Sequence, residues 1–159
     1  MMKSIKIRLE LNNKQVTLAN KHAGVARYAY NWGKSVCDLA IQNKEHRPTA
    51  IDLHKKFVKE EKTIKPWLYE VSKCSPQQAL RNLDEAYKRM FKVKSSKYPK
   101  FKKKGQHNSF YLEGAIKTNS NKIKVPKFGW LRCSETLPKC EIKNVVISKT
   151  ADQWFIAFK

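Results

Sequence analysis

The sequence changes character on either side of a lysine-rich segment, and this change limits the folds that it can adopt. Seven lysines occupy the fourteen residues from Lys92 to Gly105, and no acidic residue lies between Glu85 and Glu113. Like charges at this density repel one another unless a polyanion neutralises them. Residues 94–108 are therefore expected to form a basic loop, with helical patterns before it and strand patterns after it.

The first part of the chain predicts a strand followed by a long helix. Residues 4–11 alternate polar and apolar side chains, as a half-buried strand does. The pair Asn12-Asn13 suits a turn and a helix cap. Apolar residues then recur every three or four positions over residues 16–43, which is typical of an amphipathic helix with a buried stripe that extends to Leu39.

Two further helices are predicted before the loop. Thr49–Asp52 has the form of a capping box, which opens a second helix expected to end near Lys62. Ser75 is the expected cap of a third helix, because proline follows in the first turn and glutamine stands three residues on. The buried stripe of this helix is expected to run over residues 79–91.

Short segments with strand patterns follow the loop, separated by turn residues: 109–112, 117–119, 122–125, 130–133, 140–148 and 153–158. We expect the opening strand to join them. The predicted fold class is therefore α+β, a β-barrel or curled sheet with a three-helix insertion. The expected division is a first strand (1–14), a helical insertion (15–93), the basic loop (94–108) and the remaining strands (109–159).

The charge balance of the whole chain favours a polyanionic partner. Lysine and arginine number 34 against 13 acidic residues, which gives a net charge of +21 over 159 residues. Such a charge raises association rates with polyanions. A membrane is the competing polyanion, but no apolar run approaches the length of a membrane span, and Lys6 and Arg8 interrupt the opening apolar residues. We expect a soluble cytoplasmic protein, with association to the nucleoid left open.

Residues for catalysis, metals or cofactors are not apparent in the sequence. The acidic residues are dispersed, whereas metal-dependent nucleases need several carboxylates that converge. Five glycines make a phosphate-binding loop improbable, so no cofactor is predicted. Cys37, Cys74, Cys133 and Cys140 form no Cys-x-x-Cys pair. Reduced free thiols are the expected state, with structural zinc as a minor alternative.

Two places are candidates for contact with nucleic acid. The first is the basic loop, where aromatic rings among cations suit bases beside phosphates; its candidate residues are Lys94, Lys97, Tyr98, Lys100, Phe101, Lys102, Lys103 and Lys104. A solvated lysine tail is the alternative, but it would usually lack the aromatic residues. The second is the helix over residues 27–32, where Arg27, Tyr28 and Asn31 are candidates. Packing between helices explains the aromatic residues there equally well.

Several motifs, in this order, resemble the amino-terminal half of the TnpB/OrfB proteins of insertion sequences. They are Gln15 at the start of a helix, Arg27-Tyr28-x-Tyr30-Asn31-Trp32, Trp67-Leu68, Gln77-Gln78-Ala79-Leu80-x-x-Leu83-x-x-Ala86-Tyr87, Pro99–Gly105 and Pro126-Lys127-x-Gly129-Trp130. None is decisive alone, but the collinear series is specific and covers nearly the whole chain.

The resemblance implies the properties of an RNA-guided DNA nuclease of mobile elements. The family's first half forms a β-barrel wedge domain with an inserted helical recognition domain, described as a transposase helix-turn-helix. Together they hold guide RNA and read a motif beside the DNA target, while base pairing supplies sequence specificity. Family members continue into a RuvC-like nuclease domain and a zinc ribbon, whose motifs are not found in this sequence. The expectation is therefore nucleic-acid binding by a truncated TnpB-like protein, without catalysis.

Two other functions stay open at this point. The chain is a subunit of a split RNA-guided nuclease if a separate RuvC portion completes it. Phe155 and Phe158 motivate that hypothesis, because aromatic residues on an unpaired edge strand would favour association. Alternatively, the chain is a stand-alone DNA-binding regulator that uses its helical part.

Overall fold

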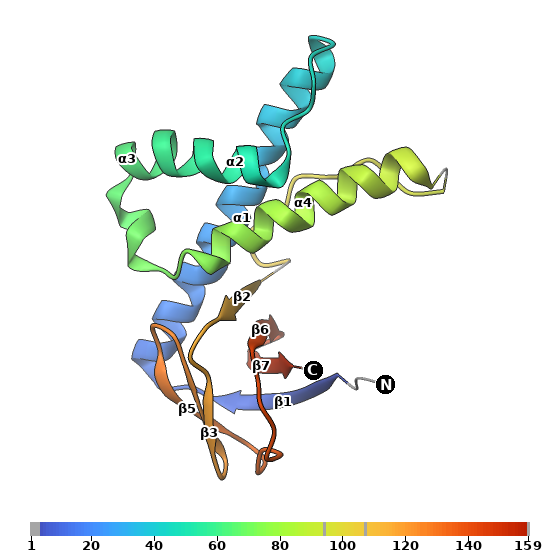
Figure 1. Cartoon of the computed structure of the whole chain (residues 1–159). Coiled ribbons are helices and arrows are strands. Elements are labelled where there is room, and N and C mark those ends of the chain that lie inside the picture. The colour runs from blue at the N-terminus through green and yellow to red at the C-terminus, as the bar shows by residue number, and fades with distance from the viewer. Residues whose placement is uncertain (1–3, 94, 107, 159) are drawn as a thin grey trace.

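The protein consists of a layer of helices on a curved antiparallel sheet (Figure 1). A computed structural model describes residues 4–93, 95–106 and 108–158. The helices, in chain order, are α1 (Asn13–Gln42), α2 (Ala50–Lys56), the π-helical turn η1 (Phe57–Glu61), α3 (Lys62–Ile64), the 3-10 helix η2 (Pro66–Glu70) and α4 (Cys74–Lys92). The strands are β1 (Ile5–Glu10), β2 (Ser109–Glu113), β3 (Lys117–Asn119), β4 (Lys122–Val125), β5 (Gly129–Cys133), β6 (Asn144–Thr150) and β7 (Gln153–Phe158).

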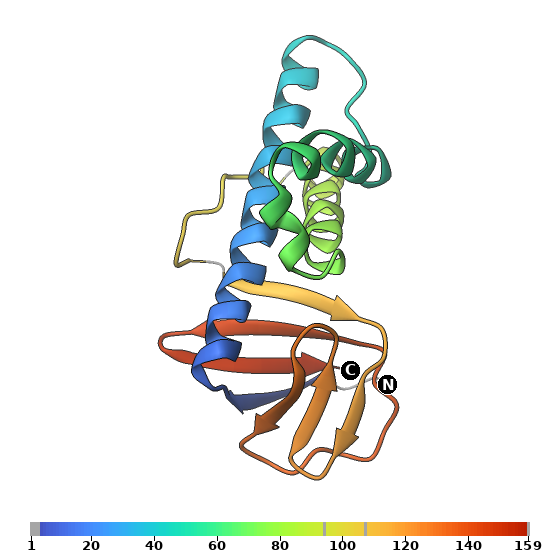
Figure 2. The same cartoon turned by 90° about the vertical axis from the view of Figure 1, so that its left-hand side faces the viewer.

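The predicted α+β class is confirmed, and β1 joins the later strands as expected. The sheet has the order β2-β6-β7-β1-β5-β4-β3, and its pairs are antiparallel. β1 pairs with β7 from Ile5↔Phe158 to Leu9↔Trp154, but it meets β5 only at Leu9↔Cys133 and Glu10↔Arg132. Strands β3–β5 therefore turn away from β6 and β7, as Figure 2 shows.

The described residues form an open sheet, so of the two predicted forms the curled sheet is confirmed and the β-barrel is wrong. β2 and β3 are its two edges and do not pair with each other. The expectation that Phe155 and Phe158 lie on an unpaired edge is also wrong, because β7 pairs with β6 on one side and β1 on the other. The reason is that β1 lies in the middle of the sheet, between β7 and β5, and covers the edge of β7. The division of the chain into separate domains stays a prediction.

Helix α1 begins where its sequence predicts. The Asn12 side chain accepts a hydrogen bond from the Gln15 backbone N–H at 2.9 Å, and the Gln15 side chain accepts one from the Asn12 N–H at 3.0 Å. This capping box satisfies two N–H groups that the helix leaves without partners. Leu39 does not belong to the buried stripe; it is 58% exposed because the last turns of α1 extend beyond the other helices (Figure 1).

The second predicted helix begins at its capping box, with Thr49 as the cap and Asp52 as its partner. We expected this helix to continue to about Lys62, but its continuation is not a regular α-helix. The π-helical turn η1 interrupts it between α2 and α3, and there Phe57 is fully buried. Such turns widen a helix by one residue.

Helix α4 begins at Cys74, so the prediction that Ser75 caps it is wrong. Ser75 lies inside the first turn, where its hydroxyl donates to the His22 backbone carbonyl at 3.1 Å. The serine therefore joins α4 to α1 instead of capping its own helix. Most of the predicted stripe is buried, but Phe91 is 64% exposed near the end of the helix.

The strand predictions agree with the structure to within two residues, apart from one boundary. Residues 140–143 lie outside the sheet, and β6 begins at Asn144. The turns occur where expected, with left-handed backbone at Ser120, Lys127 and Ala151. All four cysteines are free. None of the helices in the described part of the chain is long and apolar enough to span a membrane.

His22 lies at the junction between the helical layer and the sheet. Its Nδ1–H donates to the Leu18 carbonyl at 2.9 Å, and its Nε2 accepts the Ser72 backbone N–H at 3.0 Å. The rings of Phe110 and Phe128 flank it, each with its centroid 4.9 Å away. Burial is the main cause that lowers the pKa of His22 to about 4, and the charge of Lys127 adds to this effect.

Candidate nucleic-acid interface

Residues 95–106, called the lysine segment from here on, run back along α1. Figure 2 shows this segment in yellow on the side of α1 opposite the green helices α2 and α3. Lys94, one of the predicted contact residues, lies outside the described residues. The remaining predicted residues of the loop belong to this segment, so their placement depends on what attaches it to α1.

Asn31 attaches the middle of the lysine segment to α1. Its Nδ2 donates to the Lys102 carbonyl at 2.9 Å, and its Oδ1 accepts the Lys102 backbone N–H at 2.8 Å. One side chain therefore satisfies both backbone groups of a loop residue, which would otherwise need water or secondary structure. The amide of Asn31 is one of the few side-chain types that can donate and accept at once.

Asp38 attaches the start of the segment. Its carboxylate accepts the Tyr98 hydroxyl at 2.5 Å and the Tyr87 hydroxyl at 2.6 Å, and it pairs with the ammonium of Lys34. Burial raises the pKa of Asp38, but the hydrogen bonds from Lys34, Tyr87 and Tyr98 outweigh burial and leave it lowered. The carboxylate is therefore held in its charged form. Burial and the bond to Asp38 also raise the pKa of Tyr98.

The ammonium group of the buried Lys34 contacts the two aromatic rings of the segment. Its Nζ lies 4.3 Å from the ring centroid of Phe101 and 5.1 Å from that of Tyr98. Cations over ring faces are attracted by the ring quadrupole, more strongly where water is excluded. Lys34 is 6% exposed, yet Phe101 above it is 54% exposed. Phe101 thus contacts Lys34 through its ring and exposes a large part of its surface to solvent.

The lysines of the segment fall into two groups. Lys102 turns inward, with its Nζ 4.2 Å from the ring centroid of Tyr30, and burial lowers its pKa. Lys97, Lys100, Lys103 and Lys104 are exposed. None of these four takes part in the ion pairs found between described residues. The segment therefore presents them to solvent as positive charges on an attached backbone.

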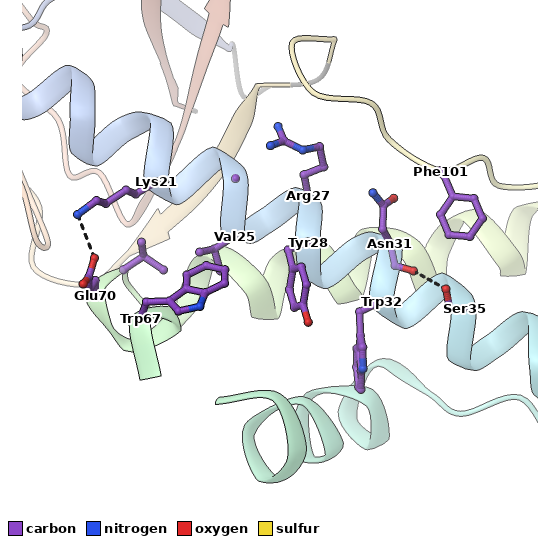
Figure 3. A pocket seen from close by; sticks show the side chains of 12 residues that line it. Lys21, Val25, Arg27, Tyr28, Asn31, Trp32, Ser35, Trp67, Glu70 and Phe101 are labelled. Carbon is purple, nitrogen blue, oxygen red and sulfur yellow. Dashed lines mark hydrogen bonds and ion pairs between the residues drawn. The ribbon is translucent and has the colours of Figure 1, made fainter. Parts of the chain in front are cut away.

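Tyr28 also has partners within the protein. Its hydroxyl donates to Glu61 at 2.5 Å and accepts from the Lys65 ammonium at 2.6 Å. Burial is the largest cause that raises its pKa. Arg27 points to the other side of α1 from Tyr28 (Figure 3) and is partly exposed. Of the three residues predicted on this helix, Arg27 is thus the one whose side chain forms no hydrogen bond with another described residue. Their contact with nucleic acid stays a prediction.

A hollow of about 740 Å³ lies beside the lysine segment and is called the aromatic groove below. It is lined by Lys21, Gly24, Val25, Arg27, Tyr28, Asn31, Trp32, Ser35, Trp67, Glu70, Val71 and Phe101. Figure 3 shows Trp67 from η2 beside α1, with Phe101 at the far end. Lys21 pairs with Glu70 at 3.0 Å across one rim.

Trp67 and Lys21 were not among the residues predicted to bind nucleic acid. No local pattern indicates that Trp67 lies against α1, because this contact depends on how the helices pack. A partial signal existed on α1 itself. Residues 21, 25, 28 and 32 recur at the spacing of one helix face, and this face lines the groove.

The turn at residues 125–130 packs on the core through Phe128. The rings of Phe128 and Phe110 are stacked, with centroids 5.8 Å apart. Trp130 is 43% exposed, and its backbone carbonyl accepts the Gln15 side-chain amide at 3.1 Å. Among the described residues, no group of three or more His, Cys, Asp or Glu side chains could hold a metal ion.

Comparison with known proteins gives a consistent set of relatives. Residues 1–46 match the family model HTH_OrfB_IS605, described as a helix-turn-helix domain. The chain is 27% identical over 172 residues to an Escherichia coli (strain K12) protein named as a candidate RNA-guided DNA endonuclease, InsQ. It is 27% identical over 163 residues to a protein of Streptomyces pristinaespiralis named as a candidate RNA-guided DNA endonuclease.

These matches cover nearly all of this chain but a minority of its relatives. They include 99% and 98% of the chain, and 40% of each relative. The described residues within the matched range 1–46 form strand β1 and the single uninterrupted helix α1, whose 30 residues contain no turn.

Proposed function

We propose that this chain, which is related to the TnpB/OrfB proteins of insertion sequences along nearly its whole length, binds nucleic acid through the lysine segment and the adjoining face of α1. One observation carries the proposal: the segment that Asn31 and Asp38 attach to α1 carries the exposed lysines Lys97, Lys100, Lys103 and Lys104. A solvated lysine tail would have no reason for such attachments.

Attachment matters because it reduces the cost of binding. A free loop loses conformational entropy when it settles on a ligand. In the lysine segment, the hydrogen bonds of Asn31 to the Lys102 backbone and of Asp38 to the Tyr98 hydroxyl hold the segment in place before a ligand arrives. The exposed lysines then contact phosphates at a smaller cost in conformational entropy. Binding also releases the counterions of the polyanion.

The proposed contacts are to the sugar–phosphate backbone and carry little sequence information. In an RNA-guided system the sequence is read by base pairing, while the protein grips the backbone. We propose guide RNA, target DNA or both as the ligands, in line with the names of the two relatives. Sequence reading by a helix-turn-helix is less favoured, because that motif needs two helices joined by a short turn, and α1 is continuous.

The proposed activity is nucleic-acid binding. The nuclease names belong to relatives of which this chain covers 40%. A hypothesis of a split nuclease loses its original motive in this structure, because β7 is paired along both edges.

A salt titration of nucleic-acid binding tests the proposal. With about six to ten phosphates engaged, affinity should fall by roughly 10³ to 10⁵ between 50 and 200 mM salt. Filter binding of a labelled RNA and a labelled DNA of mixed sequence would measure this slope. An affinity that stays constant over the range, or no binding at 50 mM salt, would contradict the proposal.

A further inference from the structure

We propose that the aromatic groove receives unpaired bases, so that the ligand includes a single-stranded stretch where it crosses α1. This inference rests on the proposed function and narrows its substrate class. The lysine segment would hold the phosphates, and the groove beside it would hold one or two of the bases attached to them.

The rings of the groove leave surface for a ligand. Trp67 is 50% exposed and Phe101 is 54% exposed, although large aromatic side chains in a small protein are usually well covered. Both project from short segments that lie against α1, η2 in one case and the lysine segment in the other. Exposed rings that line the same hollow are the arrangement by which proteins stack successive bases.

The contacts between the aromatic rings leave part of the ring faces uncovered. Tyr28 meets Trp67 edge to face, with centroids 6.1 Å apart and ring planes at 65°. Trp32 meets Phe57 in the same way, at 5.3 Å and 64°. An edge-to-face contact covers the face of only one ring of each pair. The rings of the groove are therefore held by contacts with each other and with the buried Phe57, while Trp67 and Phe101 keep surface open for stacking.

Charge decides between a base and an apolar protein segment as the occupant. Lys21 and Arg27 line the groove, and Lys100 and Lys102 flank Phe101 in the sequence. The Lys21 charge is paired with Glu70, but no ion pair between described residues involves Arg27 or Lys100. An apolar peptide gains nothing from these cations, whereas a nucleotide offers a ring for the groove and a phosphate for its rim.

The size of the groove favours unpaired bases over a duplex. Its volume of about 740 Å³ is in the range of sites that enclose small ligands. Bases within a duplex stack on each other, so only those in single strands, loops or bulges present free faces to a protein. A duplex would reach the lysine segment but would have no ring to place in the groove.

The test compares three polyanions on the full chain: a single-stranded oligothymidylate, a DNA duplex and inorganic polyphosphate, which has phosphates but no bases. Trp67→Ala and Phe101→Ala should each lower affinity for the single strand roughly tenfold. Neither should change affinity for polyphosphate by more than about twofold, and the dependence on salt should stay as in the unmodified protein. Trp130→Ala is the matched control, since Trp130 is similarly exposed but lies on the sheet.

Each outcome distinguishes this inference from the proposed function. Equal losses for all three ligands, or an unchanged affinity for the single strand, would overturn the groove as a base site; the unchanged affinity would point to a protein segment as its occupant. Failure of the unmodified protein to bind any polyanion would instead overturn the proposed function. Trp67→Phe, which keeps an aromatic ring, should retain most of the single-strand affinity, and this holds the test valid if Trp67→Ala fails to fold.

Discussion

The helical layer and the sheet are stabilised in different ways. In the described residues, the buried polar or charged side chains are His22, Lys34, Lys62, Ser72, Ser75 and Asp84, and they all belong to helices or to the link before α4. The buried side chains of the strands are hydrophobic. Between side chains, the sheet thus depends on burial of apolar surface, which has no preferred direction, whereas the helical layer also depends on hydrogen bonds from particular polar side chains.

This difference explains why the lysine segment is attached to the helices. A directional bond fixes a loop in one place, as Asn31 and Asp38 do on α1. The exposure of the cations on the sheet follows from strand alternation alone. Lys122, Lys124 and Arg132 alternate with buried residues, so they occupy the solvent side of strands β4 and β5. Directional bonds also make the helical layer sensitive to pH and to the loss of one partner.

The largest predicted effect on stability comes from removing Asp38. Asp38→Ala leaves the buried Lys34 ammonium without its carboxylate, and the loss of one partner from such a pair costs about 3 kcal/mol or more. Urea denaturation would measure the change in unfolding free energy. Asp152→Ala, in the exposed turn between β6 and β7, is the control and should stay within about 0.5 kcal/mol. A loss below 1 kcal/mol for Asp38→Ala would mean that this carboxylate does not hold the helical layer together.

A pH dependence of slightly smaller size should come from His22. Its folded pKa of about 4 lies below the ordinary value of 6.5, so the unfolded chain binds a proton that the folded chain does not. The corresponding stability is complete above pH 6.5 and is lost as pH falls from 6.5 toward 4, by about 3 kcal/mol in total. Denaturation at a series of pH values measures it.

The control for the pH effect is His22→Asn. This variant should be less stable than the unmodified protein at pH 7, because the buried bond to Ser72 is disturbed. Its stability should nevertheless change less between pH 6.5 and 4.5, since the titrating group is gone. The same slope in both proteins would assign the pH dependence to other groups.

The smallest predicted effect concerns the packing of α1 on α4 and has opposite signs at two glycines. A Cβ at Gly33 would lie 2.7 Å from Leu80 Cδ2 and 2.9 Å from Leu83 Cδ2, and both leucines are fully buried. Gly33→Ala should therefore destabilise the protein by about 1 kcal/mol, after about 1 kcal/mol of gained helix propensity is set against the overpacking.

Gly24→Ala should instead stabilise the protein by up to about 1 kcal/mol, because the nearest atom to the added Cβ is Arg27 Nη2 at 3.8 Å. Thermal unfolding of the two variants measures the difference. Equal shifts of the same sign would show that the close approach of α1 and α4 at Gly33 is not needed.

Local patterns predicted the elements of this fold well, and contacts between distant residues account for what they missed. The capping boxes at Asn12 and Thr49 depend on residues three positions apart, so the sequence predicts them directly. The role of Ser75 depends on His22, 53 positions away, and a local cap was predicted there instead. The choice between a β-barrel and a curled sheet could not be inferred either, since closure depends on how strongly β1 bends between its two neighbours.

In the candidate site, too, local features could be predicted and contacts between distant residues could not. The cations and rings of the lysine segment are evident from composition, and most of them are exposed as expected. The inward turn of Lys102 and the bond from Asn31 are not evident, because they join positions 71 residues apart. The groove formed with Trp67 depends on the same kind of long-range packing.

The most direct test of nucleic-acid binding by the lysine segment compares two triple variants that remove equal charge. Lys100, Lys103 and Lys104 are replaced by glutamine in one, and Lys122, Lys124 and Arg132 in the other. Affinity for RNA and DNA at 0.1 M salt should fall by roughly a hundredfold in the first, for all sequences alike, with a salt slope smaller by about 2 to 3. The second should lose less than about tenfold. Equal losses in the two variants would show that net charge alone drives binding and that the attached segment has no special part in it.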